Sequence, residues 1–178
     1  MALGSTDGLS DGELATFRQL LDRDAIAQAK YQWARAADAS DADRMVERFV
    51  EDCTAVYEAH GQPIVGREAL RQWNVDRLAH VTASSHHVSN IEVRFDGPDN
   101  ATAYSYLHSW QHFDDYPETP DRTRYARYVD TWVRKDGVWW QKSLRLLVAG
   151  EWNFAGPLRF GEYRGYDEDI DGVAPAPR

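Results

Sequence analysis

Beyond residue 84 the apolar residues of this chain alternate with polar ones, and short turn sequences separate the alternating segments. A period of two is typical of strands that bury one face, so these segments predict a sheet. The turns Gly97-Pro98-Asp99-Asn100 and Asp136-Gly137 favour antiparallel neighbours in a meander. The predicted strands span residues 85–95, 101–113, 124–135 and 138–149.

The residues before this region have a helical period instead. Between Leu14 and Ala37 the apolar positions recur at intervals of three and four, which indicates a long helix with one buried face. Ser10 or Asp11 is positioned to cap its start, and the polar run Asp22-Arg23-Asp24 leaves open a break into two helices. This first segment supplies one wall against which a sheet can pack.

Two shorter helices are predicted after the long one. A second helix, capped by Asp41 or Asp43, is expected to include Phe49 and Val50 and to close before a strand at 54–57. A third is predicted from Gly66 to Leu78, after a connection punctuated by glycine and proline. Helices first and strands later predict an α+β fold, a curved antiparallel sheet packed on N-terminal helices.

Length and composition favour a single domain. The chain has 178 residues, of which 43% are hydrophobic, and no shift in composition suggests a second domain. We predict a flexible N-terminus over 1–10, a folded domain over 11–155 and a C-terminal tail over 156–178.

Charge and cysteine content exclude several classes of function. The formal net charge of −9 and the absence of a Lys/Arg cluster argue against a nucleic-acid partner. Cys53 is the only cysteine, so no intramolecular disulfide is expected. The first ten residues lack the features of a secretion signal, and no apolar stretch approaches the ~18 residues of a membrane span. A cytoplasmic protein with no membrane partner is expected.

Two adjacent histidines at the head of the first long strand, His86 and His87, are the most plausible groups for proton transfer, because imidazole titrates near neutrality. A carboxylate at the end of the long helix, such as Asp38, could orient one of these rings. Strict alternation favours His87 as the inward ring. A β-bulge between His86 and Ile91 would instead turn His86 inward.

Several motifs in order resemble one family. They are Trp33-Ala34-Arg35-Ala36-Ala37-Asp38, Phe49-Val50-Glu51-Asp52, Gly66-Arg67-Glu68-Ala69-Leu70, His86 four residues before Asn90, Arg127-Tyr128-Val129-Asp130 and Arg134-Lys135-Asp136-Gly137-Val138-Trp139. Together they resemble the SnoaL-like group of the nuclear-transport-factor-two-like superfamily, and most closely the branch of scytalone dehydratase and bile acid 7α-dehydratase.

This resemblance implies a cone-shaped α+β barrel, usually oligomeric, that works without metal or organic cofactor. It assigns His86 and Asp38 to the family's catalytic pair. Bile acid 7α-dehydratase has a pocket tyrosine where this chain has Trp33, and Tyr31, Tyr57 or Tyr128 could replace its phenol. These four aromatic residues are candidate substrate contacts. The same scaffold hosts several activities, so the fold alone does not fix the reaction.

The strand over 101–113 places a row of aromatic residues on one face, which predicts either a pocket wall or a subunit interface. As a pocket wall it would add His108, Trp110 and His112 to the substrate contacts. Together with His86, two of these could suggest zinc, but the strand spacing is a signal of low specificity and no metal is predicted. Asp130 is expected to pair with Arg127 or Arg145.

The leading hypothesis is a cofactor-free, dehydratase-like lyase that acts on a small hydrophobic ring compound, with His86 as general base and Asp38 as its partner. One alternative is an isomerase or aldol-type cyclase that uses the same base. Another is a non-catalytic small subunit of a ring-hydroxylating dioxygenase, or a ligand-binding module. The abundance of aromatic residues predicts a homo-oligomer, and the resemblance favours a trimer.

Overall fold

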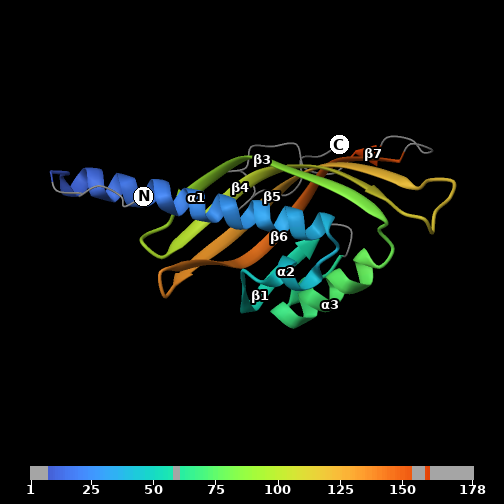
Figure 1. Cartoon of the computed structure of the whole chain (residues 1–178), viewed down its shortest axis with the longest axis horizontal. Helices are drawn as coiled ribbons and strands as arrows, with labels where there is room; N and C mark the ends of the chain where they lie inside the picture. Colours follow the sequence, from blue (N-terminus) through green and yellow to red (C-terminus); the bar gives the residue numbers. More distant parts are fainter. Residues whose placement is uncertain (1–7, 58–60, 154–158, 161–178) are drawn as a thin grey trace.

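The computed structural model describes residues 8–57, 61–153 and 159–160. Three helices precede most of the sheet: α1 (Asp11–Asp38), α2 (Ala42–Val46) and α3 (Arg67–Leu78). Figure 1 shows α1 lying lengthwise along the sheet, with α2 and α3 below it. The predicted domain limits remain a prediction, and residues 1–7 and most of the proposed tail lie outside the described residues.

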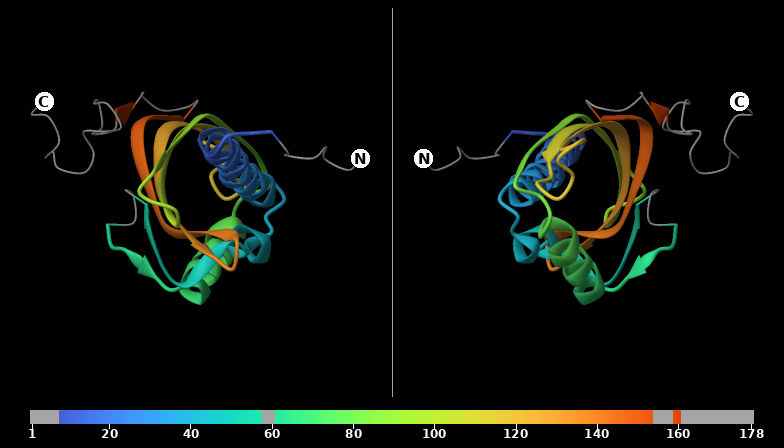
Figure 2. Two further views of the ribbon diagram at one scale, coloured as in Figure 1. Left: turned by 90° about the vertical axis from the view of Figure 1, so that its left-hand side faces the viewer. Right: turned by 90° about the vertical axis from the view of Figure 1, so that its right-hand side faces the viewer.

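The strands form one sheet in the order β2-β1-β6-β5-β4-β3, with β7 paired to β6. Their bounds are β1 (Phe49–Tyr57), β2 (Ile64–Val65), β3 (Ala83–Phe95), β4 (Asn100–His112), β5 (Asp121–Lys135), β6 (Val138–Asn153) and β7 (Arg159–Phe160). Figure 2 shows β3 to β6 as a curved sheet, with α1 and α3 opposite its concave side. The predicted α+β cone is therefore confirmed.

The sheet differs from the prediction in two respects. It is mixed rather than antiparallel, because β1 runs parallel to β6 while the meander β3 to β6 is antiparallel throughout. It is also not closed into a barrel, since β2 and β3 are the ends of the strand order among the described residues. The long chain path between β1 and β6 is what permits a parallel pair here.

The first helix is continuous through Asp22-Arg23-Asp24. The Asp22 carboxylate accepts a hydrogen bond from Trp139 Nε1 at 2.9 Å and pairs with Arg134, so the polar run binds the end of the sheet instead of breaking the helix. Ser10 caps the helix as predicted, in a capping box with Glu13.

The second helix is shorter than predicted, because Phe49 and Val50 belong to β1. The Arg48 carbonyl accepts a hydrogen bond from the Gln141 N–H at 2.7 Å, and this contact takes the chain out of the helix and into the sheet. Both Phe49 and Val50 are still buried, as their apolar character predicts. The main core lies between α1, α2, α3 and the concave face of the sheet. No helix in the described ranges is long and apolar enough to cross a membrane.

Candidate active site

The last residue of α1 meets the beginning of β3. The Asp38 Oδ1 atom lies 2.6 Å from His86 Nδ1, and its Oδ2 atom accepts a hydrogen bond from the His86 backbone N–H at 3.0 Å. The Ser84 hydroxyl donates to Asp38 Oδ1 at 3.1 Å. The carboxylate is thus held by the ring, the backbone and a neighbouring side chain of one strand.

These contacts determine which ring nitrogen of His86 carries a proton. Burial opposes ionisation of Asp38, but the hydrogen bonds from His86 and Ser84 outweigh it and lower the pKa of the Asp38 carboxyl. An ionised carboxylate only accepts hydrogen bonds, so His86 Nδ1 must donate. In the neutral ring Nε2 then keeps its lone pair, which is the arrangement of a general base. The His86 side chain is only 5% exposed.

A β-bulge explains why His86, and not His87, faces inward. The register between β3 and β4 shifts between Ser89 and Glu92, and Asn90 within this shift has φ 51°. The extra residue reverses the alternation once, so His86 before the bulge and Phe95 after it both face the concave side. The predicted bulge is present, and His87 lies on the convex face against His108.

An aromatic ring packs against the inward histidine. The Trp33 ring lies edge-on to His86, with the ring centroids 6.0 Å apart, and Tyr128 packs edge-on against Trp33 at 5.5 Å. Tyr128 is buried, and burial raises its pKa well above the usual value, so the phenol stays protonated. Trp33 therefore lies next to His86, and Tyr128 packs against Trp33.

A buried lysine beside these rings was missed in the sequence. Lys30 Nζ lies 2.7 Å from Asp130 Oδ2, and both side chains are 2% exposed. The ammonium also lies over the Tyr128 ring, 3.6 Å from its centroid. Burial lowers the pKa of Lys30 and raises that of Asp130. Asp130 thus pairs with Lys30 rather than with Arg127 or Arg145, and the available signal was a lysine within the apolar stripe of the long helix.

The other predicted substrate contacts lie elsewhere. Tyr57 is buried and stacks on Trp73 with centroids 4.3 Å apart, and burial raises its pKa above the usual range. Tyr31 lies on the exposed side of α1. His108, Trp110 and His112 occupy the convex face of β4, because their register partners alternate with those of the inward-facing residues. A site around His86 therefore excludes these three residues and Tyr31.

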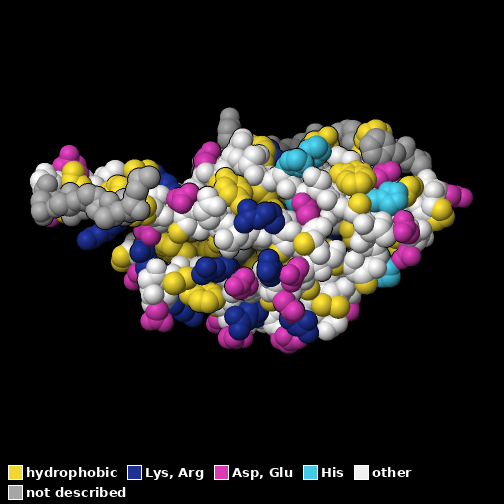
Figure 3. All heavy atoms as spheres, viewed as in Figure 1, with side chains coloured by type: hydrophobic (Ala, Val, Ile, Leu, Met, Phe, Trp, Pro, Cys, Tyr) yellow, Lys and Arg dark blue, Asp and Glu magenta, His cyan; other side chains and the backbone are white. Residues whose placement is uncertain are grey.

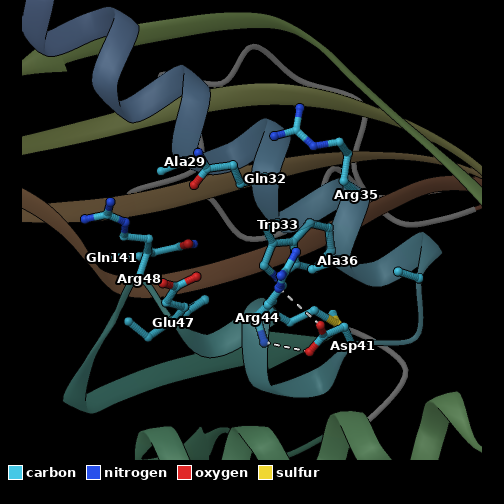
Figure 4. Close-up of a pocket in the computed structure, with 13 residues that line it drawn as sticks. Ala29, Gln32, Trp33, Arg35, Ala36, Asp41, Arg44, Glu47, Arg48 and Gln141 are labelled. Atoms are coloured by element: carbon cyan, nitrogen blue, oxygen red, sulfur yellow. Dashed lines mark hydrogen bonds and ion pairs between the residues drawn. The ribbon is translucent and has the colours of Figure 1, made fainter.

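A large groove lies on the other side of Trp33. It has a volume of about 640 Å³ between α1 and the turn from α2 into β1, and its lining includes Gln32, Trp33, Arg44 and Arg48. Figure 4 shows the Asp41–Arg44 contact at one end of this groove and Arg48 at the other. Basic and acidic side chains intermingle on this face (Figure 3). Neither His86 nor Asp38 lines it, so size alone does not identify the reactive site.

Metal ligands do not gather in the part of the chain that the structure describes, where no group of three or more His, Cys, Asp or Glu could hold a metal ion. His86 faces the opposite side of the sheet from His108 and His112, which prevents these three from sharing one ion.

Comparison with known proteins gives the family. A family model for the SnoaL-like domain matches residues 18–145. The chain belongs to the SnoaL-like domain family. Among curated proteins, no sequence matches it significantly. The sequence motifs predict membership in the nuclear-transport-factor-two-like superfamily, and the fold and the family match agree with this prediction.

Solved structures share this SnoaL-like fold at low sequence identity. One is described as a candidate scytalone dehydratase of Novosphingobium aromaticivorans, with 24% identity, a TM-score of 0.74, and coverage of 85% of this chain and 99% of the other. Another is the LinA-type3 hexachlorocyclohexane dehydrochlorinase of Novosphingobium barchaimii, with 17% identity, a TM-score of 0.71, and coverage of 80% and 96%. A third is described as a candidate aromatic ring hydroxylase of N. aromaticivorans, with 23% identity, a TM-score of 0.66, and coverage of 80% and 94%.

Proposed function

We propose that this protein is a cofactor-free lyase that catalyses dehydratase-like elimination on a small hydrophobic ring compound. The observation that carries the proposal is the 2.6 Å contact between His86 Nδ1 and Asp38 Oδ1 at a ring that is 5% exposed. A buried imidazole with an ionised partner on Nδ1 has its second nitrogen available for proton abstraction.

In the proposed reaction His86 Nε2 removes a proton from the carbon next to the one that bears the leaving group. The electron pair of the broken C–H bond forms the new double bond as the bond to the leaving group breaks. The imidazolium that results is stabilised by the Asp38 carboxylate, whose negative charge is already aligned with Nδ1. The Trp33 ring packs against the imidazole, whereas the Asp38 side chain is 31% exposed, so water reaches the carboxylate side of the pair.

Departure of hydroxide requires a proton donor. Tyr128 and Tyr57 are both buried phenols whose pKa is raised, so each is protonated at neutral pH and able to donate a hydrogen bond. Tyr128 is the better candidate, because its ring contacts Trp33, which in turn contacts His86.

The comparisons support elimination as the class of reaction. A dehydratase and a dehydrochlorinase, by their names, both remove a small group from their substrates, and relatives with these names share the fold of this chain. Transfer of that class of chemistry to this chain is part of the proposal.

The test is turnover of a panel of hydroxylated and halogenated ring compounds by the purified protein, followed by mass spectrometry. Elimination lowers the substrate mass by that of the leaving group. His86→Ala should reduce turnover by about 10²–10⁴-fold, as expected for loss of a general base. His87→Ala is the matched control, because His87 is the next residue and lies on the convex face. A larger loss in His87→Ala would contradict the proposal.

The same assay separates the two remaining alternatives. A product of unchanged mass that depends on His86 would indicate an isomerase or aldol-type cyclase. Purification together with a larger iron-bearing chain, without turnover, would indicate a non-catalytic subunit.

A further inference from the structure

A second polar region lies inside the cone, on α3 and β5. It surrounds a small cavity of about 140 Å³, and its basic residues are Arg77, Arg122 and Arg124. The cavity wall is completed by Tyr57, Trp73, Leu146 and Val148. A cluster of guanidinium groups inside a chain with a net charge of −9 requires a specific explanation.

The positive charge of this cluster is only partly compensated. Glu151 accepts a hydrogen bond from Arg124 Nε at 2.9 Å and lies 3.7 Å from Arg122 Nε. Arg77 donates to the Gln111 side-chain oxygen at 2.9 Å, and none of the described carboxylates forms an ion pair with it. Within the described ranges, three guanidinium groups therefore share one carboxylate, which leaves a binding region for an anion.

Arg77 is a partly buried cation beside a second cation. Burial, followed by repulsion from Arg124, lowers the pKa of the Arg77 guanidinium. The group nevertheless remains protonated, because guanidinium does not lose its proton in proteins. The energetic cost of removing water from this cation would be offset if a ligand supplied an oxyanion.

Unpartnered amide groups lie beside the same cluster. Asn74 precedes Arg77 by one turn of α3 and is 1% exposed, yet neither atom of its amide has a partner within the described part of the chain. The Gln111 Nε2 atom, on the residue that binds Arg77, also lacks one there. Neither Asn74 nor Gln111 lines the cavity, so these amides show that the surroundings of Arg77 are buried and polar rather than marking ligand contacts.

The register of the sheet connects this cluster to His86. Ser109 pairs with His86 on one side and with Arg124 on the other, so the three residues form one row on the concave face. Adjacent strands are about 4.8 Å apart, which separates the backbones of His86 and Arg124 by roughly 10 Å. His86 does not line the small cavity itself, so a ligand held by Arg124 would reach His86 along the row that passes through Ser109.

We infer that the substrate of this site carries a carboxylate, which Arg77 and Arg124 bind at the end of the cone interior away from His86. This inference rests on the proposed function for the identity of the reacting end. An anion at the arginine cluster is expected whichever reaction occurs at His86. A ring compound that is hydrophobic throughout would leave Arg77 without an anion.

The test compares binding of benzoate with that of benzamide, its uncharged counterpart of similar shape, by calorimetry on the full chain. Benzoate should bind more tightly, and added salt should weaken its binding more than that of benzamide. Arg77→Gln should weaken benzoate binding by about tenfold or more, as expected for loss of a charge-assisted hydrogen bond, and leave benzamide binding unchanged. Arg71→Gln is the matched control on α3, because Arg71 pairs with Glu68 and Asp43 outside the cavity.

Equal affinity for the two probes in the unmodified protein would overturn the inference, as would an Arg77→Gln variant that binds benzoate normally. If Arg77→Gln does not fold, Arg77→Lys provides the same test, because lysine keeps the charge but loses the two-pronged geometry and should still weaken benzoate binding selectively. His86→Ala should retain benzoate binding. The unmodified protein could fail to turn over any compound of the panel and still bind benzoate more tightly than benzamide. That result would contradict the proposed reaction but not the carboxylate site.

Discussion

At the scale of single residues, Asp38 determines what His86 can do. Its carboxylate receives the ring N–H, the backbone N–H of the same histidine and the Ser84 hydroxyl. Three donors around one carboxylate fix both the position and the tautomer of the imidazole. A neutral amide of the same shape would accept fewer hydrogen bonds and could offer its own N–H to Nδ1, which favours the wrong tautomer.

Asp38→Asn should therefore reduce turnover by about 10²–10⁴-fold while His86 remains in place. It should also change how stability depends on pH. Because the pKa of Asp38 is lowered in the folded state, its ionised form stabilises the fold above its ordinary value of 3.8. That contribution is lost as the pH falls through the lower folded-state pKa. Urea unfolding at pH 7 and near pH 3 should show the difference between variant and unmodified protein shrinking in acid.

Asp24→Asn is the control for this measurement, since Asp24 lies exposed on the same helix and its hydrogen bond is to Gln28. It should leave turnover unchanged. A difference between Asp38→Asn and the unmodified protein that stays constant from pH 7 to pH 3 would contradict the assignment of the pKa shift to the folded state.

At the scale of elements, the bulge in β3 brings the proposed general base and a hydrophobic segment to the same face. Residues 93 and 95 pack in the core with Trp132, while His86 faces inward earlier on the strand. With strict alternation the strand could not place both sets on the concave side. Asn90 occupies the left-handed region that the bulge requires, where asparagine is tolerated better than branched residues.

Asn90→Val should destabilise the protein by about 1–3 kcal/mol, because a β-branched side chain is strained at positive φ. Asn90→Gly should have little effect, since glycine adopts this conformation without strain. The free energies of unfolding from urea titration provide the measurement. Equal stabilities for the valine and glycine variants would mean that the bulge does not depend on the conformation of this residue.

The elements themselves could be predicted largely from local patterns. The period of two gave the meander, and the periods of three and four gave the long helix, because both patterns depend on neighbouring residues. Contacts between distant segments could not be predicted in the same way. Lys30 and Asp130 are a hundred residues apart in sequence, and their pairing follows from how α1 crosses β5. Local spacing contains no signal for such a pair.

The sequence pattern also could not predict which face of the sheet is the outer one. Alternation correctly grouped His108, Trp110 and His112 on one face of a strand, but did not determine whether that face was concave or convex. The pairing of β3 with β4 shows which face is convex. Ser109 pairs with the inward-facing His86, so the residues that alternate with Ser109 face outward. The site residues near His86 could be named from the family resemblance, whereas Arg77 and Arg124 required the assembled cone.

At the scale of the whole molecule, the convex face has aromatic side chains at its surface. The His87, His108 and Tyr125 rings form a stack across three strands, with centroid separations of 5.9 and 4.8 Å. Tyr125 is 49% exposed and Tyr106 is 39% exposed. Exposed aromatic rings on a sheet face are typical of contacts between subunits, because burying them removes a large apolar area from water.

We predict that this face mediates a homo-oligomer, with a trimer favoured by the resemblance to the dehydratase branch. Light scattering at micromolar concentration should give a mass above that of one chain, and Tyr125→Ser should shift the population toward the monomer because it removes a stacked ring that is 49% exposed. Tyr116→Ser is the control, since Tyr116 is 55% exposed but lies in the connection between β4 and β5. A monomer mass for the unmodified protein would contradict the prediction. The stacked rings would then belong to the solvent-exposed surface of a monomer.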